Sequence, residues 1–327
     1  MVRSPHNPYV TYSIVARDAA TGDLGIAVQS KFLAVGAVVP WARAGVGAIA
    51  TQSYANVAYG PDGLALLGAG ASAQEALDNL VAADMLRDQR QAGIVDTHGR
   101  GATYTGRRCF AWAGGRTGPG YAAQGNILAG AAVVDGLADT FAAGGQPFPE
   151  LLVACLAAAD AEGGDRRGRE SAAIFIAREG GGYGGGNDRW MDLRVDDHAD
   201  PIGELARLLG LQRLYLDRPG VDELVRLDEA TAGDVRALLE RVGAGPGSGF
   251  SAVYQPMQPL AADAAEAERE ARPMTGTPAT MPSNWDAPWQ QALEDWMSVE
   301  NLEERLAAPG WIDRRVLEFL RAKAGPP

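Results

Sequence analysis

The sequence is poor in the residues that build metal centres and disulfide frameworks. Its 327 residues include only 2 cysteines and 3 histidines. Cys109 and Cys155 are far apart and lack the pair spacing of metal ligands, so we expect two buried thiols without a disulfide. The histidines (His6, His98 and His198) lie in polar or turn-rich stretches, which argues against a zinc site or a histidine-dependent triad. We therefore expect no metal and no other cofactor.

Long apolar runs and an excess of positive charge are also missing. No stretch could span a bilayer, and the opening MVRSPHNPYV has no apolar core of signal-peptide length. The net charge of −12 and the pI near 4.8 argue against nucleic-acid binding and against adhesion to an anionic membrane. Hydrophobic residues make up 46% of the chain, enough for a sizeable core. We expect a folded cytoplasmic protein that binds neither nucleic acid nor membrane.

The remaining pattern alternates short strand-like runs with helices. Runs rich in Val, Ile and Ala predict strands at 11–17, 24–31, 34–39, 45–52, 91–96, 102–105, 171–178 and 189–195. Helices are predicted after the capping box Ser72–Glu75 and near 131–143 and 149–161. Most strand connections resemble hairpins, which favours antiparallel sheets over a doubly wound parallel sheet. The sequence thus predicts an α+β fold, with sheets sandwiched by helices in an α/β/β/α order.

The sequence pattern changes from strand-like to helical after Val195. Asp200-Pro201 opens a predicted helix, a second helix is predicted near 231–242, and two apolar stripes follow in the tail. The tail is too small for a stable core of its own, so we expect it to pack on the first domain, on the 201–242 helices or on a neighbouring subunit of a homo-oligomer. The expected divisions are a domain at 11–217, a helical extension at 218–243, a linker at 244–283 and a helical module at 284–327.

The first two predicted strands suggest a register for their pairing. Alternate residues are apolar both in 11–17 and in 24–31. Residues that lie directly opposite each other in an antiparallel pair share a face of the sheet. Pairing the two apolar sets therefore places Ile14 opposite Val28, with a loop at 19–23.

The same register places Thr11 opposite Lys31 and Ser13 opposite Gln29. If Thr11 were the first residue, its free α-amine, with a reference pKa of about 7.7–8.0, could accept the proton of its hydroxyl. The charge of Lys31 would lower the pKa of that amine and favour its basic form. This hairpin would then hold a nucleophile, a base and a charge that tunes the base.

Four blocks of sequence resemble a known bacterial family. They are the run 11–53, GPGYAAQGNILAG, GGDRRGRESAAIFI and DLRVDDHADP, in that order. Across residues 11–217 they resemble domain-of-unknown-function family 1028, which is similar to N-terminal-nucleophile hydrolases such as proteasome β subunits and glycosylasparaginases. The resemblance implies the same sandwich fold and an amidohydrolase that cleaves a small amide or peptide-like bond through an acyl-enzyme on Thr11.

The resemblance also assigns roles to other residues. Family members begin Met-Thr-Phe/Tyr-Ser, so Thr11 matches their N-terminal threonine. Asp165 and Ser171 resemble the aspartate and serine that flank the nucleophile's amine, which implies supporting roles. Gln29, however, stands where proteasome subunits place a catalytic aspartate.

We expect further polar residues to line the substrate site. The backbone amides at the end of the fourth predicted strand are candidate donors of an oxyanion hole. The glycine-rich segment 118–126 either lines the site or forms a tight turn. The expected oxyanion and substrate-binding residues are Ser13, Gln29, Gln52, Ser53, Gln124, Gly125 and Asn126.

Catalysis by this route requires Thr11 to become the N-terminus, although ten residues precede it. Translation could start at position 10, since valine is often encoded by a codon that also serves as a start, and the methionine would then be trimmed. Alternatively, the chain could cleave itself between Val10 and Thr11. A different interpretation makes Thr11 and Ser13 ordinary strand-edge hydroxyls of a non-catalytic binding or assembly protein.

The C-terminal segments GDVRALLERVG and WQQALEDWMSVENLEERLAAPGWIDRRVLEFLRA resemble a peptidoglycan-binding domain that is often fused behind this family. The resemblance implies a peptidoglycan fragment as a ligand. The missing signal-peptide pattern makes docking within the protein, or on another subunit, an equal alternative. Trp296 and Trp311, at helical positions, are more typical of core residues than of platforms that stack on sugars.

Overall fold

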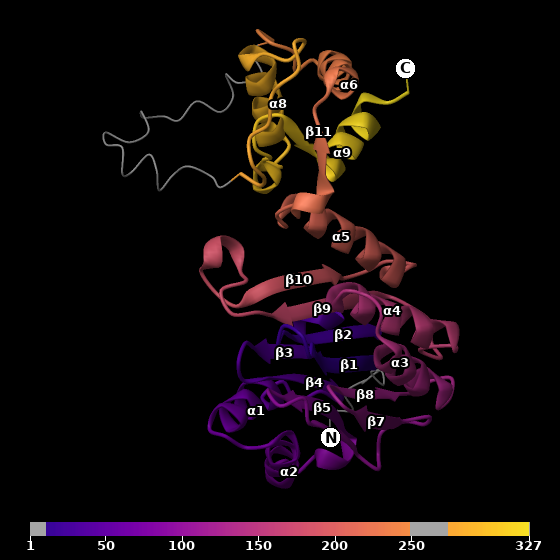
Figure 1. Ribbon diagram of the computed structural model, residues 1–327. Helices are drawn as coiled ribbons and strands as arrows, with labels where there is room; N and C mark the ends of the chain where they lie inside the picture. The colour runs from indigo at the N-terminus through magenta and orange to yellow at the C-terminus, as the bar shows by residue number, and fades with distance from the viewer. Residues whose placement is uncertain (1–10, 249–273, 327) are drawn as a thin grey trace. The chain divides into compact units, whose positions relative to one another are not determined.

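The computed structural model describes residues 11–248 and 274–326 (Figure 1). The chain divides into two compact units, the first ending at Leu209 and the second beginning at Gly210. The boundary falls within helix α5 (Pro201–Tyr215). Apolar residues of the first part of this helix belong to a core of the first unit, and Leu214 belongs to the core of the second. Each unit is therefore described by itself.

The first unit contains two antiparallel sheets. The larger sheet has the strand order β10-β9-β2-β1-β8-β7, which Figure 1 shows as a continuous series. Its strands are β1 (Thr11–Arg17), β2 (Leu24–Ser30), β7 (Gly114–Gly118), β8 (Tyr121–Asn126), β9 (Ser171–Ala177) and β10 (Arg189–Val195). The smaller sheet has the order β3-β4-β5-β6. Its strands are β3 (Pro40–Arg43), β4 (Gly47–Ser53), β5 (Arg90–Asp96) and β6 (Gly101–Thr105).

Helices cover one face of each sheet. On the larger sheet, α3 (Ala132–Ala143) and α4 (Phe148–Ala161) share a core with Tyr12 and Ile14 of β1. On the smaller sheet, α1 (Tyr59–Gly68) and α2 (Ala73–Ala83) share a core with residues of β4, β5 and β6. The Ser72–Glu75 capping box opens α2, as the sequence predicted.

The other faces of the two sheets pack on each other. Val15 and Ile26 of the larger sheet share a core with Ala50 and Val95 of the smaller one. The first unit is thus layered helix, sheet, sheet, helix, and both faces of β1 and β2 are buried. The predicted α+β fold with antiparallel sheets is confirmed.

The predicted register of the first hairpin is wrong by one residue. The structure pairs Thr11 with Ser30 and Ile14 with Ala27, and β2 ends at Ser30. The prediction assumed that only one face of each strand is apolar, whereas both faces are covered here. The alternation of apolar residues along these strands therefore does not indicate which residues share a face.

Other elements also differ from the sequence prediction. Residues 34–39 do not form a strand; they hold the 3₁₀ helix η1 (Val35–Ala37), preceded by Ala34 in the left-handed conformation with φ 53°. Strand β3, helix α1 and the hairpin of β7 with β8 were not predicted. The described residues also form the 3₁₀ helices η2 (Arg87–Gln89), η3 (Tyr183–Gly185), η4 (Val221–Glu223) and η6 (Glu303–Arg305).

The second unit has a core that joins the predicted extension and the predicted tail module. Besides the end of α5, its described residues form helices α6 (Glu229–Arg241), α8 (Ala287–Val299) and α9 (Arg314–Ala324), and β11 (Leu224–Arg226) pairs antiparallel with β12 (Trp311–Asp313). Val235 and Leu239 of α6 share a core with Trp296 of α8 and Leu320 of α9. The tail therefore packs on the 201–242 region, one of the three sites expected for it. The predicted linker 244–283 lies largely outside the described residues.

Cys109 and Cys155 are both free thiols, as expected. Cys155 is buried, whereas Cys109 is only half-buried. Within residues 11–248 and 274–326, no helix has the length and apolar character needed to cross a bilayer.

We predict that Trp296→Ala destabilises the second unit by about 3–5 kcal/mol, because a fully buried side chain shared by α8 and α9 is replaced by a cavity. Urea unfolding followed by circular dichroism measures the loss. Met281→Ala is the control, since Met281 is exposed and should change stability by less than about 0.5 kcal/mol. A Trp296→Ala protein that unfolds at the wild-type urea concentration would contradict the shared core.

Candidate functional site

A cluster of buried amide side chains lies between the two sheets. Gln52 comes from β4, Gln91 from β5, and Gln124 and Asn126 from β8, and each is at most 1% exposed. Buried polar groups are costly unless they are hydrogen-bonded. The free-energy cost of burying this cluster therefore depends on how completely its members hydrogen-bond with each other and with the backbone.

Gln91 lies at the centre of the cluster. Its Oε1 accepts from Gln52 Nε2 at 2.9 Å and from Asn126 Nδ2 at 3.0 Å. Its Nε2 donates to the backbone oxygens of Gly125 at 2.8 Å and Gly114 at 3.2 Å, which belong to the larger sheet. Because Nε2 also donates to Thr105 Oγ1 at 2.9 Å, this side chain of the smaller sheet connects to four strands: β4, β6, β7 and β8.

The same amides hold the first residues of β1. Gln52 Nε2 and Asn126 Nδ2 donate to the carbonyl oxygen of Thr11 at 3.2 and 3.4 Å. Ser13 Oγ donates to Gln52 Oε1 at 2.6 Å and accepts from Gln124 Nε2 at 2.7 Å. Gly93 makes room for this arrangement, since a Cβ there would lie 2.0 Å from Gln124 Oε1.

The hydroxyl of Thr11 lies on the face of β1 that points towards the smaller sheet, with Ser13 and Val15. Its Oγ1 is 3.1 Å from Ser30 Oγ. Thr11 also lines a cavity of about 190 Å³, together with residues of β4 and of the β2–β3 connection. The other residues that line it are Phe32, Val35, Val38, Val39, Gln52, Ser53 and Ala55.

Ser53 has an unusual backbone conformation in this cavity. It ends β4 with φ 68°, in the left-handed region that residues other than glycine seldom adopt. The chain turns there, and the amide of Ala55 donates to Ser53 O at 2.9 Å. Such conformations cost free energy and are found preferentially at functional sites.

Lys31 does not lie beside Thr11, contrary to the predicted register. Ser30 occupies that cross-strand position. The ammonium of Lys31 instead pairs with Glu170 Oε2 at 3.3 Å, and its side chain is 42% exposed. A charge that is exposed and paired at the surface is screened by solvent. The prediction that Lys31 lowers the pKa of the Thr11 α-amine is therefore wrong.

Asp165 and Ser171 hold the chain that follows β2. Asp165 Oδ2 accepts from the backbone amide of Lys31 at 2.8 Å. Ser171 Oγ accepts from the amide of Val35 at 3.1 Å and donates to Phe32 O. Both side chains therefore position the segment 31–35, which forms one wall of the cavity next to Thr11.

Gln29 faces away from Thr11 and Ser13. It lies opposite Tyr12, whose ring belongs to the core beneath α3 and α4. Gln29 is fully buried, and within the described residues neither its Nε2 nor its Oε1 has a hydrogen-bond partner. The predicted pairing of Ser13 with Gln29 is wrong for the same reason as the register.

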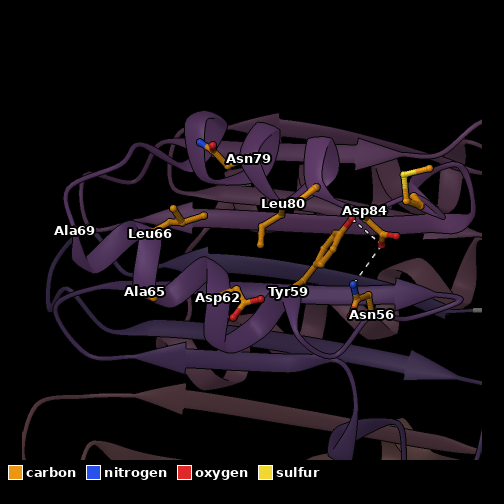
Figure 2. Close-up of a pocket in the computed structure, with 11 residues that line it drawn as sticks. Asn56, Tyr59, Asp62, Ala65, Leu66, Ala69, Asn79, Leu80 and Asp84 are labelled. Atoms are coloured by element: carbon orange, nitrogen blue, oxygen red, sulfur yellow. Dashed lines mark hydrogen bonds between the residues drawn. The ribbon is translucent and has the colours of Figure 1, made fainter.

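A larger pocket, of about 630 Å³, lies between α1 and α2 (Figure 2). In its interior Asp84 accepts from Asn56 Nδ2 at 3.3 Å, Tyr59 Oη at 3.2 Å and Arg90 Nε at 2.8 Å. Burial raises the pKa of Tyr59, and the Asp84 carboxylate raises it further. Asn56, Tyr59 and Asp84 of this pocket are thus engaged with each other, so the Thr11 cavity is the better candidate for chemistry.

Comparison with known proteins places residues 11–205 in a family. They match the family model described as "Family of unknown function (DUF1028)". The chain belongs to the DUF1028 family. Residues 278–320 match a second model, described as "Putative peptidoglycan binding domain". Both resemblances seen in the sequence are confirmed.

A solved structure agrees with the DUF1028 assignment. The crystal structure of protein SPO2555 from Silicibacter pomeroyi, titled as a DUF1028 family member, superimposes with a TM-score of 0.57 at 29% sequence identity. The match covers 62% of this chain and 89% of that chain. A search of curated proteins found no match.

Sequence reasoning on this DUF1028 protein missed Gln91. The residue begins a strand that was predicted, and its neighbours gave no reason to single it out. A signal was present, however, because a glutamine within a buried apolar strand must find partners. Those partners lie 14 to 39 residues away, which a local pattern does not reveal.

We predict that Gln91→Leu destabilises the DUF1028 unit by about 1–3 kcal/mol or more, because buried amides and carbonyls lose their partner. Chemical unfolding followed by circular dichroism measures the change. The control is Gln74→Leu, which alters an exposed glutamine on α2. Equal stability of the two variants would show that the amide cluster does not join the sheets.

A second prediction concerns Asp165, whose pKa is raised because burial outweighs the hydrogen bonds from the amides of Lys31 and Arg167. The ordinary pKa of an aspartate is about 3.9. When the pKa is higher in the folded state, the carboxyl stabilises the fold most at a pH below this ordinary value. That stabilisation is lost as the pH rises through the folded-state pKa. Asp165→Asn should remove this component, so that the variant gains stability relative to wild type as pH rises. Parallel stability–pH curves for the two proteins would contradict it.

Proposed function

We propose that this DUF1028 protein is an amidohydrolase of the N-terminal-nucleophile type, with Thr11 as its nucleophile. The observation that carries the proposal is the position of the Thr11 hydroxyl. It lies at the start of β1, between two helix-covered sheets, and lines a cavity with the strained residue Ser53. The layering of the first unit, helix on sheet on sheet on helix, also fits the sandwich of that class.

The reaction needs only Thr11, an amide and water. Thr11 Oγ attacks the amide carbonyl carbon while the free α-amine of Thr11 takes the hydroxyl proton. The tetrahedral intermediate collapses as the C–N bond breaks, and the amine leaving group takes the proton from the α-amine. Water, deprotonated by the same amine, then attacks the ester on Thr11. The acyl C–Oγ bond breaks, the amine returns its proton to Thr11 Oγ, and the carboxylic acid is released. Atoms and charge balance without a cofactor.

The residues around Thr11 suggest how the transition state would be stabilised. The backbone amide of Ser53 is the proposed oxyanion donor, because Ser53 lines the cavity beside Thr11. The amide of Gln52 faces β5 instead, since Gln52 pairs with Gln91, and the amide of Thr51 before it donates to Val39 O on the opposite edge. Gln52 and Asn126 hold the Thr11 carbonyl, and their amides carry no titrating charge. Asp165 and Ser171 are proposed as positioning residues that act through the 31–35 segment.

A second function is supported by a separate observation, the match of residues 278–320 to a peptidoglycan-binding family. We propose that the second unit binds a peptidoglycan fragment. Its helices α8 and α9 share a core with α6, so the binding unit would include residues from 210 onwards. In the alternative to catalysis, this binding would be the whole function of the protein.

The enzyme proposal predicts that the active form begins at Thr11. Thr11→Ala should abolish amide hydrolysis, while Thr11→Ser should retain part of it, because serine keeps the hydroxyl that the reaction requires. Intact-mass measurement of protein from its native cell identifies the first residue, and a screen of small amides measures turnover.

Thr21→Ala is the matched control, since Thr21 is an exposed hydroxyl in the hairpin loop, bonded to Asp18. It should keep wild-type turnover. Native protein that retains residues 2–10 and hydrolyses no amide would favour the binding alternative. Full turnover by Thr11→Ala would refute the assignment of the nucleophile.

A further inference from the structure

The cavity beside Thr11 has a polar side and an apolar side. The polar side comes from the starts and ends of strands, namely Thr11 of β1 with Gln52 and Ser53 of β4. The apolar side comes from Phe32 and from three valines of the β2–β3 connection. Every described residue that lines it has an uncharged side chain. A substrate bound there would place its reacting carbonyl near Thr11 and the rest of its acyl group against the valines.

The apolar wall is fixed by hydrogen bonds from several elements. The amide of Ala34 donates to Asp196 O at 2.9 Å, and the amide of Val35 donates to Ser171 Oγ at 3.1 Å. At the other end, the amide of Thr51 donates to Val39 O at 3.1 Å. Gly36 packs so closely that an added Cβ would lie 2.6 Å from Ala173 Cβ. A wall held in this way has little freedom to widen for a larger group.

The volume limits the group that fits. The cavity measures about 190 Å³, whereas one water occupies roughly 30 Å³ in the liquid and an apolar cavity of roughly 150 Å³ accommodates benzene. A branched acyl chain of about five carbons therefore fits within this volume, while a long chain would extend beyond it. A charged acyl group would lose hydration that the uncharged side chains of the described lining residues do not replace, which is unfavourable.

We propose that the cavity selects substrates whose acyl group is short, branched and aliphatic, and that it rejects acidic and basic acyl groups. This inference rests on the proposed function, because it names the substrate class of the Thr11 site. Specificity then lies in the β2–β3 connection, and Val38 is the most accessible of its three valines, since it is half-buried whereas Val35 and Val39 are buried.

Binding tests the inference without requiring turnover. The probes are isovaleramide and succinamate, which are similar in length but differ in charge, titrated into protein that begins at Thr11 and followed by NMR. We expect isovaleramide to bind at least tenfold more tightly. Val38→Arg should reverse that order by giving the carboxylate a partner, and Val38→Phe should weaken isovaleramide binding by filling the cavity. Val57→Arg, at an exposed position that does not line the cavity, should leave both affinities unchanged.

Equal binding of the two probes, or unchanged affinities in both Val38 variants, would overturn the selectivity. Turnover of isovaleryl and succinyl 4-nitroanilides then separates this inference from the proposed function. Isovaleramide binding without any Thr11-dependent hydrolysis of the anilides would contradict the enzyme and leave the selectivity standing. Thr11-dependent hydrolysis of both anilides at equal rates would contradict the selectivity alone.

Discussion

The hydrogen bonds of the Gln91 carboxamide are the interactions on which the first unit depends most. This carboxamide reaches from the smaller sheet to the carbonyls of Gly114 and Gly125 in the larger sheet, and it accepts from Gln52 and Asn126. Because the same two amides hold the carbonyl of Thr11, the packing of the sheets and the placement of the candidate nucleophile share one set of hydrogen bonds. Amides suit this role, since they pair in both directions and stay neutral at every pH of interest.

The second feature that shapes the site is the chain between β2 and β3. Asp165 and Ser171 bind its backbone, so residues distant in sequence determine where Phe32 and Val35 lie. This explains how an aspartate and a serine could matter to the Thr11 site without touching the hydroxyl. In that arrangement the site has a polar side fixed by the amide cluster and an apolar side fixed by the loop anchors.

Much of the fold could be predicted from the sequence, because capping residues and runs of β-branched residues are local signals. Strand β1 and the start of α2 follow directly from them. The register could not be predicted, since β1 and β2 are buried on both faces and alternation no longer separates inside from outside. Helix α1 was not predicted, because its sequence YGPDGLALLG contains glycines and a proline, which disfavour a helix. At the site, Thr11 was found through the family resemblance, Lys31 was misplaced with the register, and Gln91 depends on long-range contacts.

The central claim, that Thr11 forms an acyl-enzyme, is tested most directly by trapping the intermediate. Protein that begins at Thr11 is mixed with isovaleryl 4-nitroanilide, quenched in acid during turnover, digested and mapped by mass spectrometry. We predict one isovaleryl group on the peptide that starts at Thr11, and none when hydroxylamine is added before digestion, because hydroxylamine cleaves esters. Steady turnover with no acyl group on Thr11, or with the group on another hydroxyl, would contradict the mechanism.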